Sequence, residues 1–200
     1  MGLLTQAKPP LDKTSPGSTR EVADQIAALD VDEFKDTLEL RATLDYMAVK
    51  MAADQRSDAD CDKLRVCAVS IEAVCGVVDI EAAIASEVAL YAAIYSATQN
   101  DMLCQLADGF GERIQENIRQ NRLRLNGSEV TRRILRDQQG DIIDAILRKD
   151  GVAAGDALLL HLAFIREALV ELEAVELRLA QIQKNLDNAK LCMDPEGAPS

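Results

Sequence analysis

Four polar residues fall within stripes of apolar residues that repeat at helical spacing. Glu87 and Tyr91 are four residues apart on one stripe, Gln139 lies on a second and His161 on a third. Residues four apart share one face of a helix, so the heads of Glu87 and Tyr91 can meet. Buried polar groups must be hydrogen-bonded or functional, and one shared polar pocket in a helical bundle would satisfy all four. Taken singly, each could instead be a structural residue that only satisfies a neighbouring group.

The composition restricts the chemistry that such a pocket could carry. The chain has 200 residues, of which 34 are acidic and 22 basic, for a net charge of −12, and it has a single histidine. One histidine excludes any site that needs two imidazoles from the same chain. The acidic balance makes the chain a poor autonomous binder of nucleic acid, because phosphate affinity comes from clustered lysine and arginine. No nucleophile–base pair and no glycine-rich phosphate loop is present, so we do not expect an enzyme.

The cysteines and the N-terminus indicate a reducing, cytoplasmic compartment. The five cysteines form no C-x-x-C pair, their number is odd, and they sit within helical patterns as small apolar residues. Residues 1–17 contain no apolar core of signal-peptide length, and no apolar run approaches the roughly 18 residues that a membrane span requires. We therefore expect no membrane partner.

The distribution of proline predicts an all-α fold. All five prolines lie at residues 9–16 or 195–199, whereas residues 17–194 contain none and are rich in alanine, leucine, glutamate and arginine. Aromatic residues make up only 3%, and the apolar–polar alternation typical of strands is missing. Capping residues, glycines and turn-like stretches divide the chain into these expected helices: 19–29, 31–54, 58–76, 79–98, 101–125, 129–149 and 152–190.

The last expected helix carries a heptad stripe. Its members alternate at steps of three and four residues: Leu158, His161, Ile165, Ala168, Leu172, Val175, Leu179, Ile182, Leu186 and Ala189. The first half could lie along its own domain, but beyond about residue 175 the helix should outrun it, and an apolar stripe in solvent needs a partner, most simply a second copy of the chain. We therefore expect a flexible lead-in with a short helix (1–30), a bundle (31–175) and a helical extension with a disordered tail (176–200).

The order of several short motifs resembles one protein family. Leu38–Asp45 is similar to an E-L-R-x-x-L-E signature, and Glu87–Tyr91 followed by Ala97–Asn100 is similar to D-x-x-F-H and A-S-G-N. Gln139–Ile146, with Asp150 after it, resembles H-x-x-I-x-x-A-I with a trailing Asp, and His161-Leu162 matches a closing H-L. From about Leu38 to Leu162 the chain thus resembles the FCD domain, the ligand-sensing C-terminal domain of FadR-type GntR transcription regulators.

The resemblance implies an antiparallel bundle of six or seven helices around a central cavity, in which many family members hold a divalent metal with one aspartate and three histidines. Those four positions map onto Glu87, Tyr91, Gln139 and His161, the residues that the apolar stripes single out. Tyrosine and glutamine replace two of the three imidazoles, and both are poor ligands for zinc or nickel. We therefore expect no metal cofactor, but a hydrogen-bonded pocket for a small carboxylate.

Two further residues belong to the expected ligand site. Arg41 is the one cation of the first motif, and an interior arginine could pair with the carboxylate of a ligand or, equally, form an internal salt bridge with Glu87. Asn100 could touch the pocket or cap a helix.

The function implied by the resemblance is an effector-sensing and dimerisation domain of a GntR/FadR-type regulator that binds a small organic acid. A complete regulator of this family carries an N-terminal winged helix-turn-helix, whereas residues 1–37 show no recognition-helix pattern. We therefore expect either a stand-alone sensor domain or a DNA-binding domain encoded upstream of the present start. The alternative is a non-sensing interaction protein that uses its long helix to dimerise with itself or with a related regulator.

Overall fold

Helices, without any strand, make up the part of the chain that the computed structural model describes, residues 33–76 and 79–193. They are α2 (Glu33–Gln55), α3 (Asp58–Cys75), α4 (Ile80–Ala97), α5 (Asp101–Gly109), α6 (Gly111–Leu125), α7 (Glu129–Leu147) and α8 (Gly151–Met193). The expected all-α bundle with a long C-terminal helix is confirmed. The short helix expected at 19–29 lies outside the described residues.

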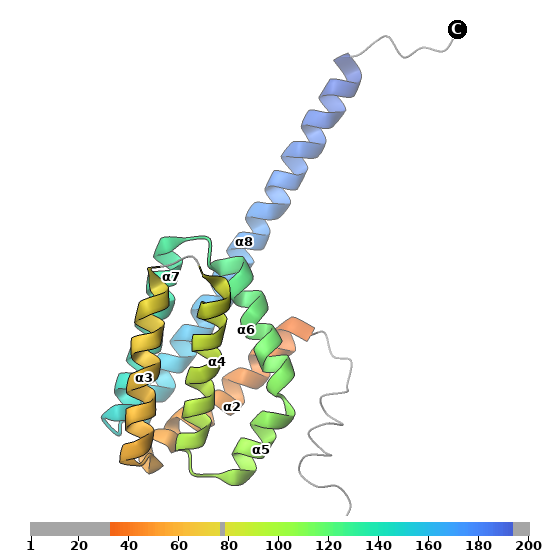
Figure 1. The fold of residues 1–200 in the computed structure, drawn as a ribbon. Helices are drawn as coiled ribbons and strands as arrows, with labels where there is room; N and C mark the ends of the chain where they lie inside the picture. Colours follow the sequence, from red (N-terminus) through yellow and green to blue (C-terminus); the bar gives the residue numbers. More distant parts are fainter. Residues whose placement is uncertain (1–32, 77–78, 194–200) are drawn as a thin grey trace, which may run out of the picture.

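The segment expected as one helix over 101–125 is two helices that meet at Phe110. This residue has φ −96° and ψ 0°, follows the end of α5, and is buried. Gly109 and Gly111 flank it, and glycine has a low helix propensity because it loses the most backbone freedom on folding. The break lets α6 take a different direction from α5 (Figure 1).

Polar side chains start four of the helices at the expected places. Ser57 caps α3 in a capping box with Asp60, while Asp79, Asn100 and Ser128 accept from backbone N–H groups in the first turns of α4, α5 and α7. These bonds satisfy backbone donors that have no partner within the helix. Asn100 is therefore a helix cap, the second of the two roles expected for it.

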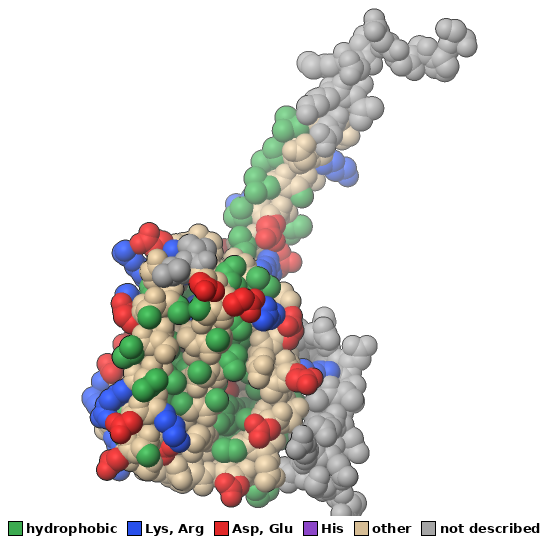
Figure 2. All heavy atoms as spheres, in the orientation of Figure 1, with side chains coloured by type: hydrophobic (Ala, Val, Ile, Leu, Met, Phe, Trp, Pro, Cys, Tyr) green, Lys and Arg blue, Asp and Glu red, His purple; other side chains and the backbone are tan. Residues whose placement is uncertain are grey.

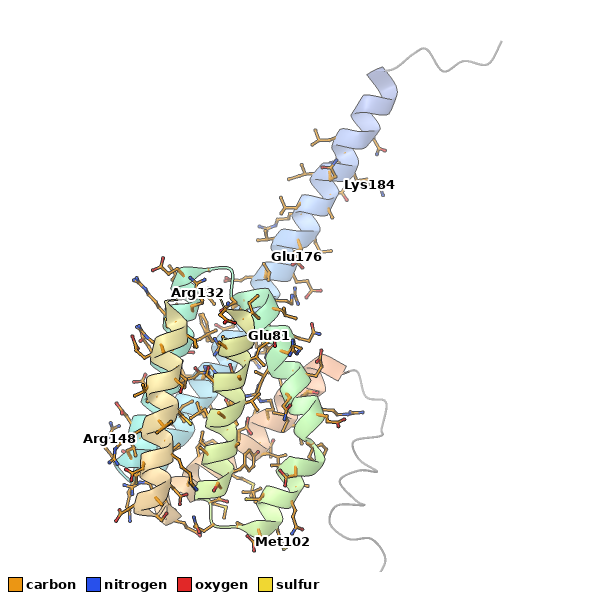
Figure 3. All side chains as sticks on the ribbon, viewed as in Figure 1. Glu81, Met102, Arg132, Arg148, Glu176 and Lys184 are labelled. Carbon is orange, nitrogen blue, oxygen red and sulfur yellow. The ribbon has the colours of Figure 1, made fainter. Side chains whose placement is uncertain are left out.

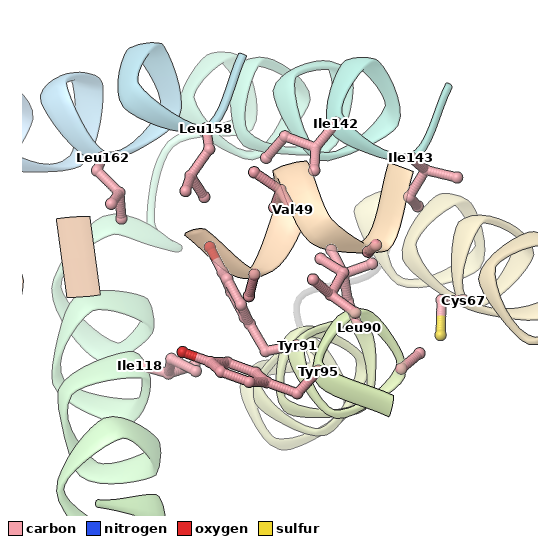
Figure 4. Packing of buried hydrophobic residues seen from close by; sticks show 14 of the residues in the cluster. Val49, Cys67, Leu90, Tyr91, Tyr95, Ile118, Ile142, Ile143, Leu158 and Leu162 are labelled. Atoms are coloured by element: carbon pink, nitrogen blue, oxygen red, sulfur yellow. The ribbon is translucent and has the colours of Figure 1, made fainter. Parts of the chain in front are cut away.

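The helices pack around one apolar core. α2 and α7 lie against α8, α3 packs against α4, and α4 also contacts α2 and α6. α4 is long and apolar enough to cross a membrane, but half of it is buried inside the bundle, as in the core helix of a globular domain. Apolar side chains from all these helices fill the core. They include Leu64 and, as labelled in Figure 4, Val49, Leu90, Ile118, Ile142, Ile143 and Leu158.

α8 projects from the bundle over its second half (Figure 1). Leu169 is its last buried side chain among the described residues. Glu176 lies where the helix leaves the bundle and Lys184 lies on the projecting part (Figure 3). Arg124 of α6 donates to Glu176 Oε2 at 3.1 Å, which ties the base of the projection to the bundle.

Candidate ligand-binding site

A group of polar side chains is buried inside the bundle, and we call it the interior polar cluster. Each member is at most 9% exposed, and together they come from α2, α4, α6, α7 and α8. The members are Arg41, Asp45, Glu87, Tyr91, Tyr95, Asn117, Asn121, Arg122, Gln138, Gln139 and His161. Buried charges are costly unless they are paired, so the partners of each group decide what the cluster can do.

Arg41 joins three helices of the cluster. Its Nε donates to Asp45 Oδ2 at 3.1 Å, and its Nη1 donates to Asn117 Oδ1 at 3.2 Å. Its guanidinium carbon lies 4.6 Å from the ring centroid of Tyr91, a cation–π contact. Its Nη2 is 4.0 Å from Glu87 Oε1 and has no hydrogen-bond partner among the described residues. The Nη2 nitrogen of Arg41 is therefore available to donate to a further acceptor.

Glu87 is held in its charged form by the cations around it. Arg122 Nε donates to Glu87 Oε2 at 2.6 Å, and Arg41 lies 4.0 Å from the other carboxylate oxygen. Burial alone would raise the pKa of Glu87, but the charges of Arg122 and Arg41, the electrostatic interaction with His161 and the hydrogen bond from Arg122 outweigh burial and hold that pKa below its ordinary value. The expected salt bridge between Arg41 and Glu87 thus exists at longer range, while each of the two has a closer partner.

Asp45 is the second buried carboxylate of the cluster. It accepts from Arg41 and, at 2.8 Å, from Tyr95 Oη. Burial raises the pKa of Asp45 in spite of the Arg41 charge and these hydrogen bonds. With both carboxylates ionised, the charges of the two carboxylates and the two arginines cancel. With Asp45 protonated, the cluster carries one net positive charge.

His161 and Gln139 are fully buried. His161 Nδ1 lies 3.1 Å from Gln138 Oε1, and burial lowers the pKa of His161 to about 4, so its imidazole is neutral at pH 7. Its Nε2, both polar atoms of the Gln139 amide and the Tyr91 hydroxyl have no hydrogen-bond partner among the described residues. A buried polar group without a partner costs about 1–3 kcal/mol. A ligand that hydrogen-bonds to several of these groups would recover part of that free energy.

The structure brings most of the predicted site residues together. Arg41 is close to both Glu87 and Tyr91, and His161 is near enough to affect the pKa of Glu87. Gln139 lines a void of about 10 Å³ together with Arg122. A void of this size holds about one water molecule.

A larger cavity, of about 670 Å³, lies beside the cluster between α3, α4, α5 and α6 and is open to solvent. Tyr91 and Tyr95 project from the same side of α4 (Figure 4), and with Ile118 they line this cavity while belonging to the buried core. Tyr91 and Tyr95 therefore belong both to the interior polar cluster and to the wall of this cavity. Asn100 also lines the cavity, and its side chain is engaged as the cap of α5, 3.1 Å from Leu103 N. A ligand that reaches the cluster from this side must displace the tyrosine rings.

Sequence reasoning missed the members of the cluster that α6 contributes. The signal was present, because residues at helical spacing form the buried stripe of this helix: Ile114, Asn117, Ile118, Asn121, Arg122 and Leu125. Three of them are polar, which is the pattern that singled out Glu87 and Tyr91. Asp45 was also missed, although it lies four residues after Arg41 on the same buried face.

Comparison with known proteins decides the family. Residues 36–164 match the model of the FCD domain family. The chain belongs to this family. Two curated relatives are each 27% identical over 159 residues, namely the "Putative L-lactate dehydrogenase operon regulatory protein" of Escherichia coli (strain K12) and the protein of the same name from Shigella flexneri. The match covers 80% of this chain, which spans about 60% of the length of these relatives. Membership confirms the expectation of a regulator-type domain rather than an enzyme.

The residues of this FCD domain do not fit the divalent metal that the family resemblance implies. Glu87 is the one carboxylate among the four ligand positions, and the guanidinium groups of Arg122 and Arg41 already flank its two oxygens. A metal ion there would meet two positive charges and would have one imidazole, one phenol and one amide as its remaining donors. No group of three histidine, cysteine or acidic side chains in the described part of the chain is arranged to hold a metal ion. We therefore assign no role to a metal.

Proposed function

We propose that this FCD domain is the effector-binding and dimerisation domain of a cytoplasmic GntR/FadR-type transcription regulator, and that its effector is a small organic acid. The observation that carries the proposal is the set of unpartnered groups in the interior polar cluster: Arg41 Nη2, the Tyr91 hydroxyl, the Gln139 amide and His161 Nε2. A carboxylate forms charge-assisted hydrogen bonds with a guanidinium, and an amide and a phenol suit a hydroxyl group on the same ligand. The relatives are named as regulatory proteins of an L-lactate dehydrogenase operon, and L-lactate is a small 2-hydroxy acid.

The charge balance of the cluster sets the condition under which an acid binds. With Asp45 and Glu87 both ionised, the cluster is neutral, and one more carboxylate would leave a net negative charge in the interior. Asp45 is the group suited to take up a proton, because burial already raises its pKa. Protonated Asp45 leaves one positive charge, which matches the single negative charge of a monocarboxylate.

Binding would be coupled to the packing of the helices. The groups that the acid would contact belong to α2, α4, α7 and α8, and the tyrosine wall of α4 must move to admit it. A ligand that binds one packing arrangement more tightly than another shifts the population towards it. Because α8 continues out of the bundle, a shift of its first half also moves the projecting part.

The proposal is tested by thermal denaturation and titration calorimetry with L-lactate and with other small hydroxy acids and dicarboxylic acids, each in the presence of EDTA or of zinc. We expect stabilisation by at least one acid, with the same affinity in EDTA. The discriminating variant is Tyr91→Phe. Since the Tyr91 hydroxyl has no partner in the free protein, this variant should be at least as stable as the wild type, yet bind the acid about tenfold more weakly.

The matched control is Tyr46→Phe. Tyr46 is a partly buried tyrosine outside the cluster, and its hydroxyl accepts from Lys50 Nζ at 3.4 Å. This control should keep the affinity of the wild type. A chain that none of the acids stabilises, or a Tyr91→Phe variant that binds as tightly as Tyr46→Phe, would refute effector binding at this cluster.

The second candidate, an interaction protein that does not sense a ligand, is favoured by one observation, the exposed apolar stripe of the projecting α8. The two functions are separable, because such a protein would associate through α8 and show no response to any acid.

A further inference from the structure

α8 carries an apolar stripe from the bundle into solvent. Inside the bundle the stripe is buried, and Leu158 and Ile165 are at most 2% exposed. Past Leu169 it continues at the same spacing, but Leu179 is 60% and Ile182 54% exposed. Figure 2 shows apolar side chains gathered along the projecting helix. A single helix gains little stability in water without packing of its apolar face, so the stripe requires a partner.

We infer that the partner is the projecting part of α8 from a second copy of the chain, and that the two helices run antiparallel. The inference rests on the dimerisation included in the proposed function and adds the surface, the orientation and the register. Three observations carry it: the length of the projecting segment, the types of residue along the stripe, and the charges beside it.

The spacing of the stripe fixes the register of an antiparallel pair. Leu172, Leu179 and Leu186 occupy heptad position a, and Val175 and Ile182 occupy position d. In an antiparallel pair, a residues pack against d residues of the other helix. Leu179 then lies opposite the partner's Ile182, and Val175 lies opposite the partner's Leu186. Each of these layers pairs a leucine with a β-branched residue, so the two layers differ in volume by only one methylene group.

The length of the projecting segment fits this register. α8 ends at Met193. In the antiparallel register just described, Met193 lies level with the partner's Ala168. That level adjoins Leu169, the point at which burial within the bundle ends. In this register residues 170–191 of each helix are paired over about 33 Å, at 1.5 Å per residue, and each tip ends level with the last buried turn of the other α8.

The residue types and charges disfavour a parallel pair. β-Branched residues at a with leucine at d favour parallel dimers, and this segment has the reverse pattern. A parallel pair would also place Glu171 at position g beside the partner's Glu176 at position e, twice by symmetry. In the antiparallel register Glu176 is near the partner's Gln183, and Arg178 is near the partner's Asn185, so no like charges meet.

Sedimentation of the full chain tests the surface. Leu179→Asp changes two symmetry-related layers of the pair at once, and we expect association at least about 100-fold weaker. The matched control is Leu177→Asp, which adds the same charge at a residue that is 66% exposed and lies outside the stripe. A dimer for the wild type and the control, with a monomer for Leu179→Asp, supports the inference. A monomeric or tetrameric wild type, or equal behaviour of the two variants, overturns it.

Disulfide cross-linking tests the orientation. In a background with Cys104→Ser and Cys192→Ser, the remaining cysteines, at 61, 67 and 75, are buried. A mixture of V175C and L186C chains should cross-link under mild oxidation, and neither variant should cross-link alone. Cross-links within a single variant would show a parallel pair and overturn the inference, as would the lack of any cross-link.

The outcomes separate this inference from effector binding. A monomeric chain whose melting temperature still rises with an organic acid would refute the helix pair alone. A cross-linked antiparallel dimer that responds to no acid would refute effector binding alone.

Discussion

Removal of Arg122 probes the interior polar cluster most directly. Its Nε donates to Glu87 Oε2 at 2.6 Å, and the two side chains are 8% and 3% exposed. Arg122→Gln leaves Glu87 buried, with Arg41 4.0 Å away as the remaining cation. Removing one partner of a buried ion pair costs about 3–5 kcal/mol. Because Arg41 still offsets part of the charge, we expect the free energy of unfolding at pH 7 to fall by about 3 kcal/mol.

The loss should depend on pH. In the wild type the pKa of Glu87 is lowered, so its contribution to stability is complete above the unfolded value of 4.5 and is lost as the pH falls through the folded value. Without Arg122, burial would dominate and raise the pKa of Glu87 above 4.5. A proton then removes the unpaired charge, and the variant regains stability relative to the wild type as the pH falls. The difference between the two proteins should therefore shrink between pH 7 and pH 5.

Urea denaturation of Arg122→Gln, Glu87→Gln and the double variant at both pH values measures these effects. The double variant removes both charges of the pair. The double-mutant cycle should therefore give a coupling free energy between Arg122 and Glu87 of about 2 kcal/mol or more. The matched control is Arg119→Gln on the same helix, which removes an exposed ion pair with Glu81, at 2.6 and 2.8 Å, and should change stability little because water screens it. An Arg122→Gln variant as stable as Arg119→Gln, or a loss that is the same at pH 7 and pH 5, would refute the reasoning.

Further predictions concern packing and protonation. Gly155→Ala should destabilise the protein by about 1–3 kcal/mol, since a Cβ at this position would lie 2.5 Å from Tyr46 Cε2 in the contact between α2 and α8. Gly140→Ala in α7 should stabilise the protein by about 0.5–1 kcal/mol, because a Cβ there would meet nothing within 4 Å. Urea midpoints that move in the same direction for Gly155→Ala and Gly140→Ala would contradict both predictions. The pKa of His161 is about 4 in the folded protein and 6.5 in the unfolded chain, so the unfolded chain takes up this proton first as the pH falls. Protonation of His161 should therefore lower the free energy of unfolding by about 3 kcal/mol between pH 7 and pH 4. His161→Gln should flatten the stability profile in this window, and an unchanged slope would show that the imidazole is not buried in its neutral form.

The helices could be predicted from the sequence because they depend on local signals. The long stretch without proline and the caps at Ser57 and Ser128 fix where helices can run and where they begin. The break at Phe110 has no local signal of this kind, since two glycines only weaken a helix, and burial of the Phe110 ring depends on tertiary packing. In the same way, the heptad stripe of α8 is visible in the sequence, but the residue at which burial ends is set by the lengths of the helices that pack beside it.

The candidate site shows where periodicity stops being informative. Helical spacing identifies the faces on which Glu87, Gln139 and His161 lie, and the first motif of the family resemblance identifies Arg41, but neither signal identifies a partner on another helix. Arg122 follows Glu87 by 35 positions in the chain, and only the packing of α4 against α6 brings their side chains together. Where many members of the family are thought to hold a metal ion, this chain has Tyr91 and Gln139 in place of two imidazoles. The positive charge beside Glu87 is supplied instead by Arg122, a residue of the chain itself. A guanidinium stays protonated and cannot be exchanged as a metal ion can, so the positive charge beside Glu87 is a fixed part of the interior polar cluster.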